Sequence, residues 1–407
     1  MSRFDHNFSM TPEDIIEYIR EKMPDFFDGS KLNCKEIGDG NINYVYRVVS
    51  EQTGKSLIVK HAETVTRSTG KQTSTDRNRI EAEILKIERD LAPENVPEIY
   101  LYDPIMCCVI MQDIGDHENL RYSLIAHKTY PTLAQDLAVF MAQTLIRTSD
   151  LVLPPDQKKA YTGQFINPAM CAITERLVLT DPYRNPEGRN RIFPGNEEFV
   201  DRELYGDEAL CTEAAKLKFV FQTKAQSLLH GDLHSGSIFV KPGSTMVLDP
   251  EFAFYGPAGY DVGNVIAHFV FAWANAEVTM DDAMEKAAFQ QWVEKTVEQT
   301  LDGFVRKSKQ ILQDDCTDPM FRNGEFTDWY LNDILQDTAG FAGTELIRRV
   351  VGSAKVKDLE CIADPEKRIR MERICIRAAK AFILGRQSGF ARGAEYVTAL
   401  RGAAEEF

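Results

Sequence analysis

The stretch LHGDLHSGSIF (residues 229–239), followed by MVLDPEF (residues 246–252), decides the fold prediction. In both segments an apolar run leads into a turn that contains acids, which is costly unless the acids are solvated, paired or bound to metal. The turn-forming sequence KPGS (residues 241–244) separates the two segments. We therefore predict a hairpin that places Asp232 and Asp249 at neighbouring strand ends.

The acids of this hairpin are those that a phosphoryl-transfer centre needs. One of the two aspartates can accept the proton of a substrate hydroxyl, while the other, together with Glu251, supplies oxygen ligands for Mg²⁺ on the phosphates of ATP. Two alternatives stay open: the acids are paired turn carboxylates without a catalytic role, or His230 and His234 bind zinc in a metallohydrolase. Two histidines four residues apart suit a helical zinc site, but the glycine between them and the strand-like flanks disfavour a helix.

A second candidate for nucleotide binding lies near the N-terminus. The sequence GDGNIN (residues 38–43) lies between two strand-like segments, and no Gly-Lys-Ser/Thr follows, so it is not a Walker A loop. A hairpin containing Gly38 and Gly40 can bring backbone amides onto phosphates, as in protein-kinase-like folds. Lys60 ends the next apolar strand, and Glu81 lies on or beside the buried face of the following helix. We expect this lysine to bind the α- and β-phosphates and this glutamate to hold it in place.

Two further sets of charged residues have both structural and functional interpretations. Asp261 starts an apolar helix, where it either complements the helix dipole or braces the catalytic loop. Arg348 and Arg349 are adjacent on a largely apolar helix, and such a pair is usually a solvated helix face. In a chain of net charge −15 the pair is also a candidate anchor for phosphate or for the transition state.

The order of predicted elements indicates an α+β protein of two lobes. Thr11 and Pro12 begin an amphipathic helix, and strands, one helix and another strand follow it. After residue 113 the pattern becomes mainly helical. We predict a protein-kinase-like fold with a nucleotide-binding lobe (1–113) and a catalytic and substrate-binding lobe (114–407). The predicted strands are 34–38, 44–49, 56–60 and 109–111, and the predicted helices are 76–91, 133–146, 211–229, 259–274 and much of 283–401.

Length and composition limit the class of protein. A chain of 407 residues exceeds the usual size of one hydrophobic core. The net charge of −15 argues against binding to nucleic acid or to an anionic membrane, since either requires a basic surface. The eight scattered cysteines contain no Cys-x-x-Cys pair, and no run approaches the ~18 apolar residues of a membrane helix. We therefore expect a cytoplasmic protein with reduced thiols.

Five blocks of sequence together resemble the 5-methylthioribose kinase family. They extend from about residue 36 to residue 350, and thus over most of the chain. Generic kinase-like folds share the first lysine and the two aspartates with this chain but lack the ITERLVLTDP and GFAGTELIRR blocks. The five blocks are EIGDGNINYV (36–45), ITERLVLTDP (173–182), HGDLHSGSIF (230–239), DPEFAFYGP (249–257) and GFAGTELIRR (340–349).

The resemblance implies a fold similar to that of choline and aminoglycoside kinases, a homodimer, and a role in methionine salvage. The implied reaction is ATP-dependent phosphorylation of the anomeric hydroxyl of 5-methylthioribose. By this likeness Asp232 is the base, and Asp249-Pro250-Glu251 carries Mg²⁺ at the nucleotide. Asn43 and Lys60 contact the nucleotide phosphates, Gln112-Asp113-Ile114 lines the adenine hinge, and Arg348 and Arg349 reach the substrate.

Three positions depart from the family pattern. Ser237 stands where many kinase-like folds have a second metal-binding asparagine, so we expect Glu251 to take over that role. Gln112 replaces the glutamate of the hinge, and Gly70-Lys71-Gln72-Thr73 replaces a stretch that typically contains tryptophan.

Two alternative functions stay open at this point. One is a kinase for another small alcohol, such as choline, an aminoglycoside or homoserine. The other is a nucleotide-binding pseudokinase that acts as a scaffold, which loss of Lys60, Asp232 or Asp249 would favour; all three are present.

Overall fold

The structure is a computed structural model, and it describes residues 2–37, 43–62 and 76–407. The chain divides into two compact units, Met1–Asp116 and His117–Phe407, and each is treated separately below. Gly38, Gly40 and the segment Gly70–Thr73, all named above, lie outside the described residues. In the described part of the chain no helix is long and apolar enough to cross a membrane.

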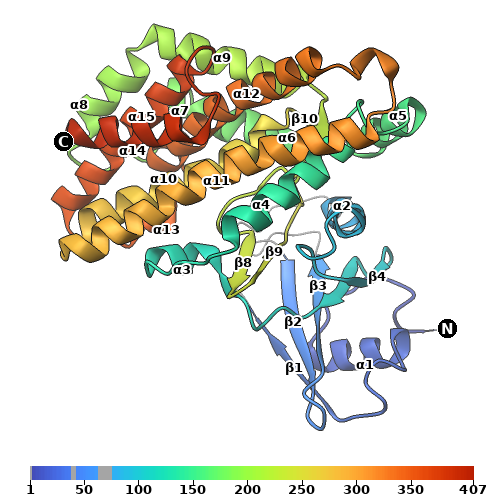
Figure 1. Cartoon of the computed structure of the whole chain (residues 1–407). Coiled ribbons are helices and arrows are strands. Elements are labelled where there is room, and N and C mark those ends of the chain that lie inside the picture. Colours follow the sequence, from blue (N-terminus) through green and yellow to red (C-terminus); the bar gives the residue numbers. More distant parts are fainter. Residues whose placement is uncertain (1, 38–42, 63–75) are drawn as a thin grey trace. The chain divides into compact units, whose positions relative to one another are not determined.

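The first unit is built around a five-stranded antiparallel sheet with the strand order β1-β2-β3-β5-β4 (Figure 1). Its central strand β3 is buried along almost its whole length, as expected for a strand with neighbours on both sides. The elements are α1 (Pro12–Lys22), β1 (Leu32–Glu36), β2 (Asn43–Ser50), β3 (Ser56–Ala62), α2 (Asp76–Leu91), β4 (Ile99–Asp103) and β5 (Cys108–Gln112).

Helix α1 begins where the sequence predicts. Thr11 and Asp14 form a capping box: the Asp14 amide donates to the Thr11 hydroxyl (3.3 Å), and the Thr11 amide donates to the Asp14 carboxylate (2.8 Å). These bonds satisfy amides that a helix start otherwise leaves without partners. The helix then buries Ile15, Tyr18 and Ile19 in a hydrophobic core shared with the sheet.

Two details of the sheet differ from the prediction. The first strand runs from Leu32 to Glu36, two residues earlier than predicted, because its register follows pairing with β2 rather than its own apolar pattern. Strand β4 was not predicted. It lies at the edge of the sheet and its side chains are mostly half-buried, so it lacks the apolar alternation that marks a strand with one buried face.

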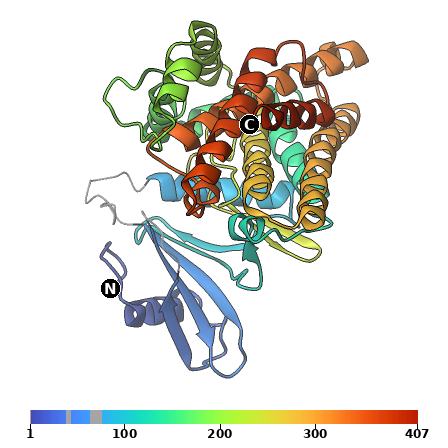
Figure 2. The same cartoon turned by 90° about the vertical axis from the view of Figure 1, so that its left-hand side faces the viewer.

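The second unit is mainly helical (Figures 1 and 2). Helix α10 is buried almost all round, which is the property of a helix at the centre of a helical domain. It packs against α11, α12 and α14, and α11 also packs against α4 and α15. The helices are α3 (Leu120–Ile125), α4 (Leu133–Met141), α5 (Pro155–Gln164), α6 (Pro168–Leu177), α7 (Asp181–Arg184), α8 (Glu197–Val200), α9 (Glu208–Thr223), α10 (Gly259–Thr279), α11 (Ala283–Asp315), α12 (Gly324–Val351), α13 (Lys357–Glu360), α14 (Pro365–Gly385) and α15 (Gly393–Glu405).

Short strands form two small sheets in this helical unit, and all of them except β6 (Glu118–Asn119) lie between α9 and α10. Strands β6, β8 (Ile238–Lys241) and β9 (Ser244–Val247) form one small sheet, and β7 (Ser227–Leu228) pairs with β10 (Tyr255–Gly256). Three single turns complete the unit: two π-helical segments, Ala142–Ile146 and Asp201–Tyr205, and a 3₁₀ turn, Pro319–Phe321. The α+β class, with a sheet-rich first unit and a mainly helical second unit, is thus confirmed.

The predicted helix over 211–229 is wrong at its C-terminal end. Helix α9 ends at Thr223, because Lys224 leaves helical geometry (φ −95°, ψ 81°). Ser227 and Leu228 then pair with Gly256 and Tyr255 as a strand. The apolar residues that extended the helical pattern belong to the strand that leads into the catalytic loop.

Candidate active site

The hairpin predicted from the sequence is present. Strands β8 and β9 pair antiparallel with Ile238 opposite Val247, and the Leu248 amide donates to the Ser237 carbonyl (2.9 Å). Asp232 therefore precedes, and Asp249 follows, the same end of one hairpin.

His230 connects the two arms of this hairpin. Its Nε2 donates to the Leu248 carbonyl (2.8 Å), and its Nδ1 accepts from the Asp232 amide (3.3 Å). Burial lowers the pKa of His230 to about 4, so the ring is neutral, although the nearby charges of Asp232 and Asp249 act in the opposite direction. Since both ring nitrogens are engaged with the backbone, His230 is a structural bridge between the arms.

The zinc interpretation of His230 and His234 is therefore not supported. The segment between them is a loop rather than a helix. Within residues 2–37, 43–62 and 76–407, no group of three or more His, Cys, Asp and Glu side chains is arranged to hold a metal ion by itself.

Asp261 braces the catalytic loop, which is one of the two roles considered for it. In the first turn of α10, its buried carboxylate accepts from the amides of His230 (2.7 Å) and Gly231 (3.0 Å). Burial raises the pKa of Asp261 to about 7, although the two amide donors favour the charged form. Gly231 has φ +80°, and a Cβ there would collide with the Phe252 carbonyl, so the loop requires glycine.

Asp232 lies in the second unit next to charged and polar side chains. Its side chain is 27% exposed, its Oδ2 lies 3.4 Å from His234 Nε2, and its Oδ1 lies 3.9 Å from Arg348 Nη2. Burial raises the pKa of the Asp232 carboxyl, but His234 and the charges of Arg348 and Arg349 outweigh burial and hold this pKa well below its usual value. Asp232 is therefore an ionised proton acceptor.

The metal-binding candidates follow at the end of the hairpin. Asp249 has φ +67°, a conformation that an L-residue adopts only when the surrounding structure enforces it, at a cost of roughly 1–3 kcal/mol. Pro250 is buried, and Glu251 is half-buried beside it. Two carboxylates within three residues provide hard oxygen ligands of the kind that Mg²⁺ takes when phosphates and water complete its coordination. The donor set therefore fits Mg²⁺ bound together with a nucleotide.

Asn167 supports this loop and was missed in the sequence. Its Nδ2 donates to the carbonyls of Glu251 (2.9 Å) and Ala253 (3.2 Å), and its side chain is buried. Asn167 directly precedes α6, where the sequence would predict only a helix cap. Its true partners lie more than 80 positions away, so no local pattern identifies them.

The arginine pair is not a solvated helix face. On α12, the side chains of Arg348 and Arg349 are only 12% and 9% exposed. Both donate from Nε to the fully buried Glu345, and Arg349 does so at 2.8 Å. Burial raises the pKa of Glu345, but the two arginines and His268 outweigh it and hold this pKa well below its usual value. One carboxylate thus holds two guanidinium groups next to Asp232.

In the first unit, Lys60 and Glu81 are paired as expected. Lys60 Nζ lies 2.5 Å from Glu81 Oε1, and both side chains are buried. The structure adds Arg77, one turn earlier on α2, whose Nη2 donates to Asn43 Oδ1 (2.9 Å). Asn43 is itself buried, so its amide oxygen holds this arginine. Arg77 was missed because a single arginine in the first turn of a helix is normally exposed.

The side chains of the predicted adenine hinge contact the protein itself. Asp113 accepts from Arg47 Nε (2.5 Å) and from the Gly115 amide (2.8 Å), and Gln112 Oε1 accepts from the Glu98 amide (3.2 Å). Ile114 is buried. The Asp113 carboxylate and the Gln112 side-chain oxygen are thus engaged within the protein, and the Gln112 amide donates to the Glu98 carbonyl (2.8 Å).

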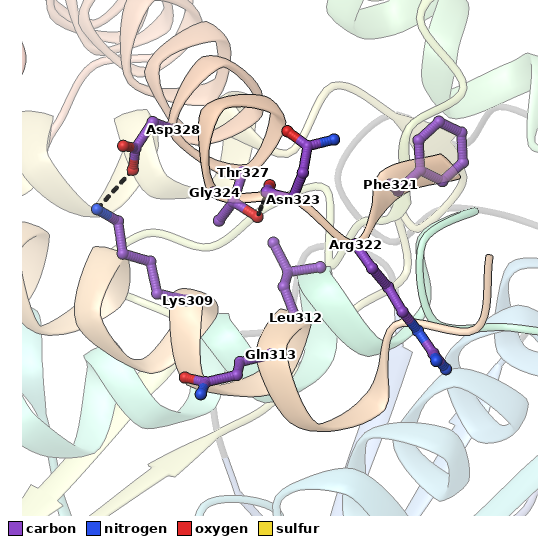
Figure 3. A pocket seen from close by; sticks show the side chains of 9 residues that line it. All are labelled: Lys309, Leu312, Gln313, Phe321, Arg322, Asn323, Gly324, Thr327 and Asp328. Atoms are coloured by element: carbon purple, nitrogen blue, oxygen red, sulfur yellow. Dashed lines mark hydrogen bonds and ion pairs between the residues drawn. The ribbon is translucent and has the colours of Figure 1, made fainter. Parts of the chain in front are cut away.

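A pocket of about 450 Å³ lies elsewhere in the second unit, where the end of α11 meets the start of α12 (Figure 3). Lys309 and Asp328 form an ion pair at its edge (2.7 Å). Its lining contains none of the site residues predicted from the sequence: Lys309, Leu312, Gln313, Phe321, Arg322, Asn323, Gly324, Thr327 and Asp328.

The sequence is similar to those of known phosphotransferases. Residues 33–293 match the phosphotransferase enzyme family. A methylthioribose kinase of Geobacillus sp. (strain WCH70) is 36% identical over 89% of this chain and 88% of its own length. Methylthioribose kinase 1 of Oryza sativa subsp. japonica is 38% identical over 88% of this chain and 86% of its own.

Among solved structures, choline kinase from Cryptosporidium parvum Iowa II matches with a TM-score of 0.49 and 15% identity, over 88% of this chain and 93% of that chain. Each of the two methylthioribose kinases is more than a third identical to this chain, over at least 86% of both sequences. The chain therefore belongs to the phosphotransferase family and, within it, to the methylthioribose kinases.

Proposed function

We propose that this protein transfers the γ-phosphate of ATP to the anomeric hydroxyl of 5-methylthioribose, giving 5-methylthioribose 1-phosphate and ADP in methionine salvage. The observation that carries the proposal is the ionised Asp232 beside the arginine pair, on the same hairpin end as Asp249. The names and coverage of the related kinases supply the identity of the sugar. They also favour methylthioribose over choline, an aminoglycoside or homoserine.

Asp232 accepts the proton of the attacking hydroxyl. A carboxylate whose pKa lies below its usual value is a weak base, so it serves best with an acidic hydroxyl and a proton that moves late. The anomeric hydroxyl is more acidic than an ordinary alcohol. In a loose phosphoryl-transfer transition state the nucleophile needs little prior activation, and positioning supplies most of the catalysis.

Arg348 and Arg349 stabilise the charge of the phosphoryl group during transfer. Their Nε atoms are used by Glu345, which leaves the Nη ends of the guanidinium groups for an anion. Arg348 Nη2 already lies 3.9 Å from Asp232, so the donors and the base act on the same reacting centre.

Asp249 and Glu251 would hold Mg²⁺, which when bound neutralises phosphate charge and orients the γ-phosphate. Ser237 stands where many kinase-like folds have a metal-binding asparagine, and Glu251 would take over the role of that asparagine. The Ser237 hydroxyl donates to the Asp232 carbonyl (2.9 Å), so its role is to shape the loop.

Residues of the first unit bind the rest of the nucleotide. Lys60, held by Glu81, contacts the α- and β-phosphates, and the glycines Gly38 and Gly40 with Asn43 cover them. The backbone of Gln112, Asp113 and Ile114 binds adenine. On this basis residues 1–113 are the nucleotide-binding lobe and 114–407 the catalytic and substrate-binding lobe.

Two properties of the working enzyme belong to the same proposal. The enzyme acts in the cytoplasm, where ATP is available and thiols stay reduced. All eight cysteines lie in the described residues and are free, which supports that location. It works as a homodimer, as the family resemblance implies.

The test is a coupled ADP-release assay with 5-methylthioribose, ribose, choline, homoserine and an aminoglycoside. We expect the highest kcat/KM with 5-methylthioribose and slower but measurable turnover of its ethylthio analogue, because one methylene in an apolar pocket is worth only ~1–3 kcal/mol. A higher kcat/KM for choline or the aminoglycoside would refute the assigned substrate. Absence of ADP release with every alcohol would refute the kinase.

A further inference from the structure

We propose that Glu345, His268 and Ser235 are positioning residues that fix the arginine pair relative to the catalytic loop. The three form a continuous buried connection from the loop that carries Asp232 to the helix that carries Arg348 and Arg349. The inference rests on the proposed function, because the arginine pair is taken as the group that acts on the phosphoryl.

Glu345 is the central member of this connection. Its Oε2 accepts from Arg348 Nε, and its Oε1 accepts from Arg349 Nε (2.8 Å) and lies 3.3 Å from His268 Nε2. The side chain is completely buried, so no water competes for these bonds. Both arginines are thereby oriented by the same carboxylate, one turn before them on α12.

His268, on α10, joins this carboxylate to the catalytic loop. Its Nδ1 lies 2.8 Å from the Ser235 hydroxyl, and both side chains are buried. Burial lowers the pKa of His268 to about 3, so the ring is neutral and only one of its nitrogens carries a proton. A carboxylate can only accept, so the proton is on Nε2, and Nδ1 accepts from the serine hydroxyl.

The hydrogen-bond directions along the connection are therefore all determined. Ser235 donates to His268, His268 donates to Glu345, and Glu345 accepts from both arginines as well. Ser235 is three residues after Asp232, so the base and the guanidinium groups are fixed to one framework. Such support from surrounding groups is what holds catalytic side chains within the narrow geometry that transfer requires.

The electrostatics give Glu345 a second effect. Arg348 and Arg349 are neighbours in a nearly dry environment, and burial and then Arg348 lower the pKa of Arg349. Glu345 opposes that shift. Removing its charge leaves two buried cations side by side, so they would separate or admit water, and either change displaces them from the reacting centre.

The experiment measures single-turnover phosphoryl transfer from ATP to 5-methylthioribose in Ser235→Ala, His268→Phe and Glu345→Gln. We expect the transfer rate to fall about tenfold for Ser235→Ala and up to about 100-fold for the other two variants, the scale on which a misplacement of about 1 Å slows transfer. The KM for ATP should stay within about twofold, and Ser235→Thr, which keeps the hydroxyl, should restore the rate.

A double-mutant comparison separates positioning from general stability. In a background with Arg348→Ala and Arg349→Ala, His268→Phe and Ser235→Ala should slow transfer by no more than about twofold further, because their effect runs through the arginines. Thr344→Val is the matched control. Thr344 is buried beside Glu345 on α12, but its hydroxyl donates to the Phe341 carbonyl (2.9 Å) and not to the connection. The transfer rate of Thr344→Val should therefore equal that of the wild type.

The inference would be overturned if His268→Phe and Ser235→Ala slowed transfer as much in the background without the two arginines as in the wild type. It would also be overturned if the variants had a lower thermal midpoint but, while folded, transferred phosphate at the wild-type rate. Ser235→Ala and His268→Phe decide the matter even if Glu345→Gln does not fold. A wild-type protein that fails to phosphorylate 5-methylthioribose would instead refute the proposed function itself.

Discussion

Helix α12 carries two ionic clusters that differ in what surrounds their charges. The α9 cluster consists of Lys224, Asp333, Asp337 and Arg386: Lys224 binds Asp333 and Asp337, and Arg386 lies 3.6 Å from Asp337. The arginine cluster consists of Glu345, Arg348, Arg349 and His268, two turns further along the same helix. Each cluster contains a buried carboxylate, Asp337 in one and Glu345 in the other, so burial of an acid alone does not separate them.

The balance of acids and cations separates them. The α9 cluster has at least as many acids as cations, because Arg386 also pairs with Glu213 (3.2 Å), and burial raises the pKa of Asp337 despite Lys224 and Arg386. The arginine cluster has one acid for two arginines, which hold the pKa of Glu345 low. Its excess positive charge faces Asp232, whose pKa is lowered in turn. A cluster whose charges balance within itself holds helices together, whereas one with excess charge can bind an anion.

The largest effect on turnover is expected at the carboxylate that the arginine cluster faces. Asp232→Asn removes the proton acceptor but keeps the size of the side chain, so kcat should fall ~10²–10⁴-fold. ATP affinity, measured by isothermal titration with the non-reacting variant, should change little. Near-normal turnover would remove Asp232 from the mechanism.

The next effect is expected within the arginine cluster. Arg348→Ala should lower kcat by about 10²–10³-fold, the range for loss of one donor to a charged transition state, and change the KM for ATP far less. Steady-state kinetics with both substrates separate the two parameters. A rise in the KM for ATP with unchanged kcat would assign Arg348 to nucleotide binding instead.

A smaller effect is expected at Asn167, which supports the loop of Asp249 and Glu251 and belongs to neither cluster. Asn167→Ala removes the two amide donors that hold the backbone around Glu251. The Mg²⁺ concentration for half-maximal activity should rise about 10-fold, as for other groups that orient metal ligands. Cys171→Ala, which lines the same local pocket, is the control. An unchanged Mg²⁺ titration in Asn167→Ala would show that Glu251 needs no such support.

The smallest effect on turnover is expected in the α9 cluster. Asp337→Asn weakens the contacts to Lys224 and Arg386, but Lys224 keeps Asp333 and Arg386 keeps Glu213, so the free energy of unfolding should fall by only about 1–2 kcal/mol. At a temperature where the variant is folded, kcat should match that of the wild type. A loss of kcat comparable to that of Arg348→Ala would mean that the two clusters do not differ in function.

The sequence predicted what depends on neighbours along the chain. Thr11 and Pro12 mark a helix start, and the apolar spacing over 76–91 gives the bounds of α2 together with the buried Glu81. The hairpin between Asp232 and Asp249 was also predictable, since its turn and both strands lie within one short segment.

What the sequence could not give depends on contacts between distant segments. The overextended helix at 211–229 ends because residue 227 pairs with residue 256, and Asn167 acts on a loop more than 80 positions away. Glu345 lies inside a recognised block, yet its role depends on His268 from another helix. Burial of Arg348 and Arg349 likewise follows from packing of α12 on α10 and α14.

The central claim is that the phosphate is placed on the anomeric oxygen of 5-methylthioribose, and phosphorus–proton correlation NMR of the product tests it most directly. The account predicts a single phosphorylated sugar whose phosphorus correlates with the proton on C1. A correlation with the proton on C2 or C3 instead, or a spectrum that contains only ADP and free phosphate, would contradict it.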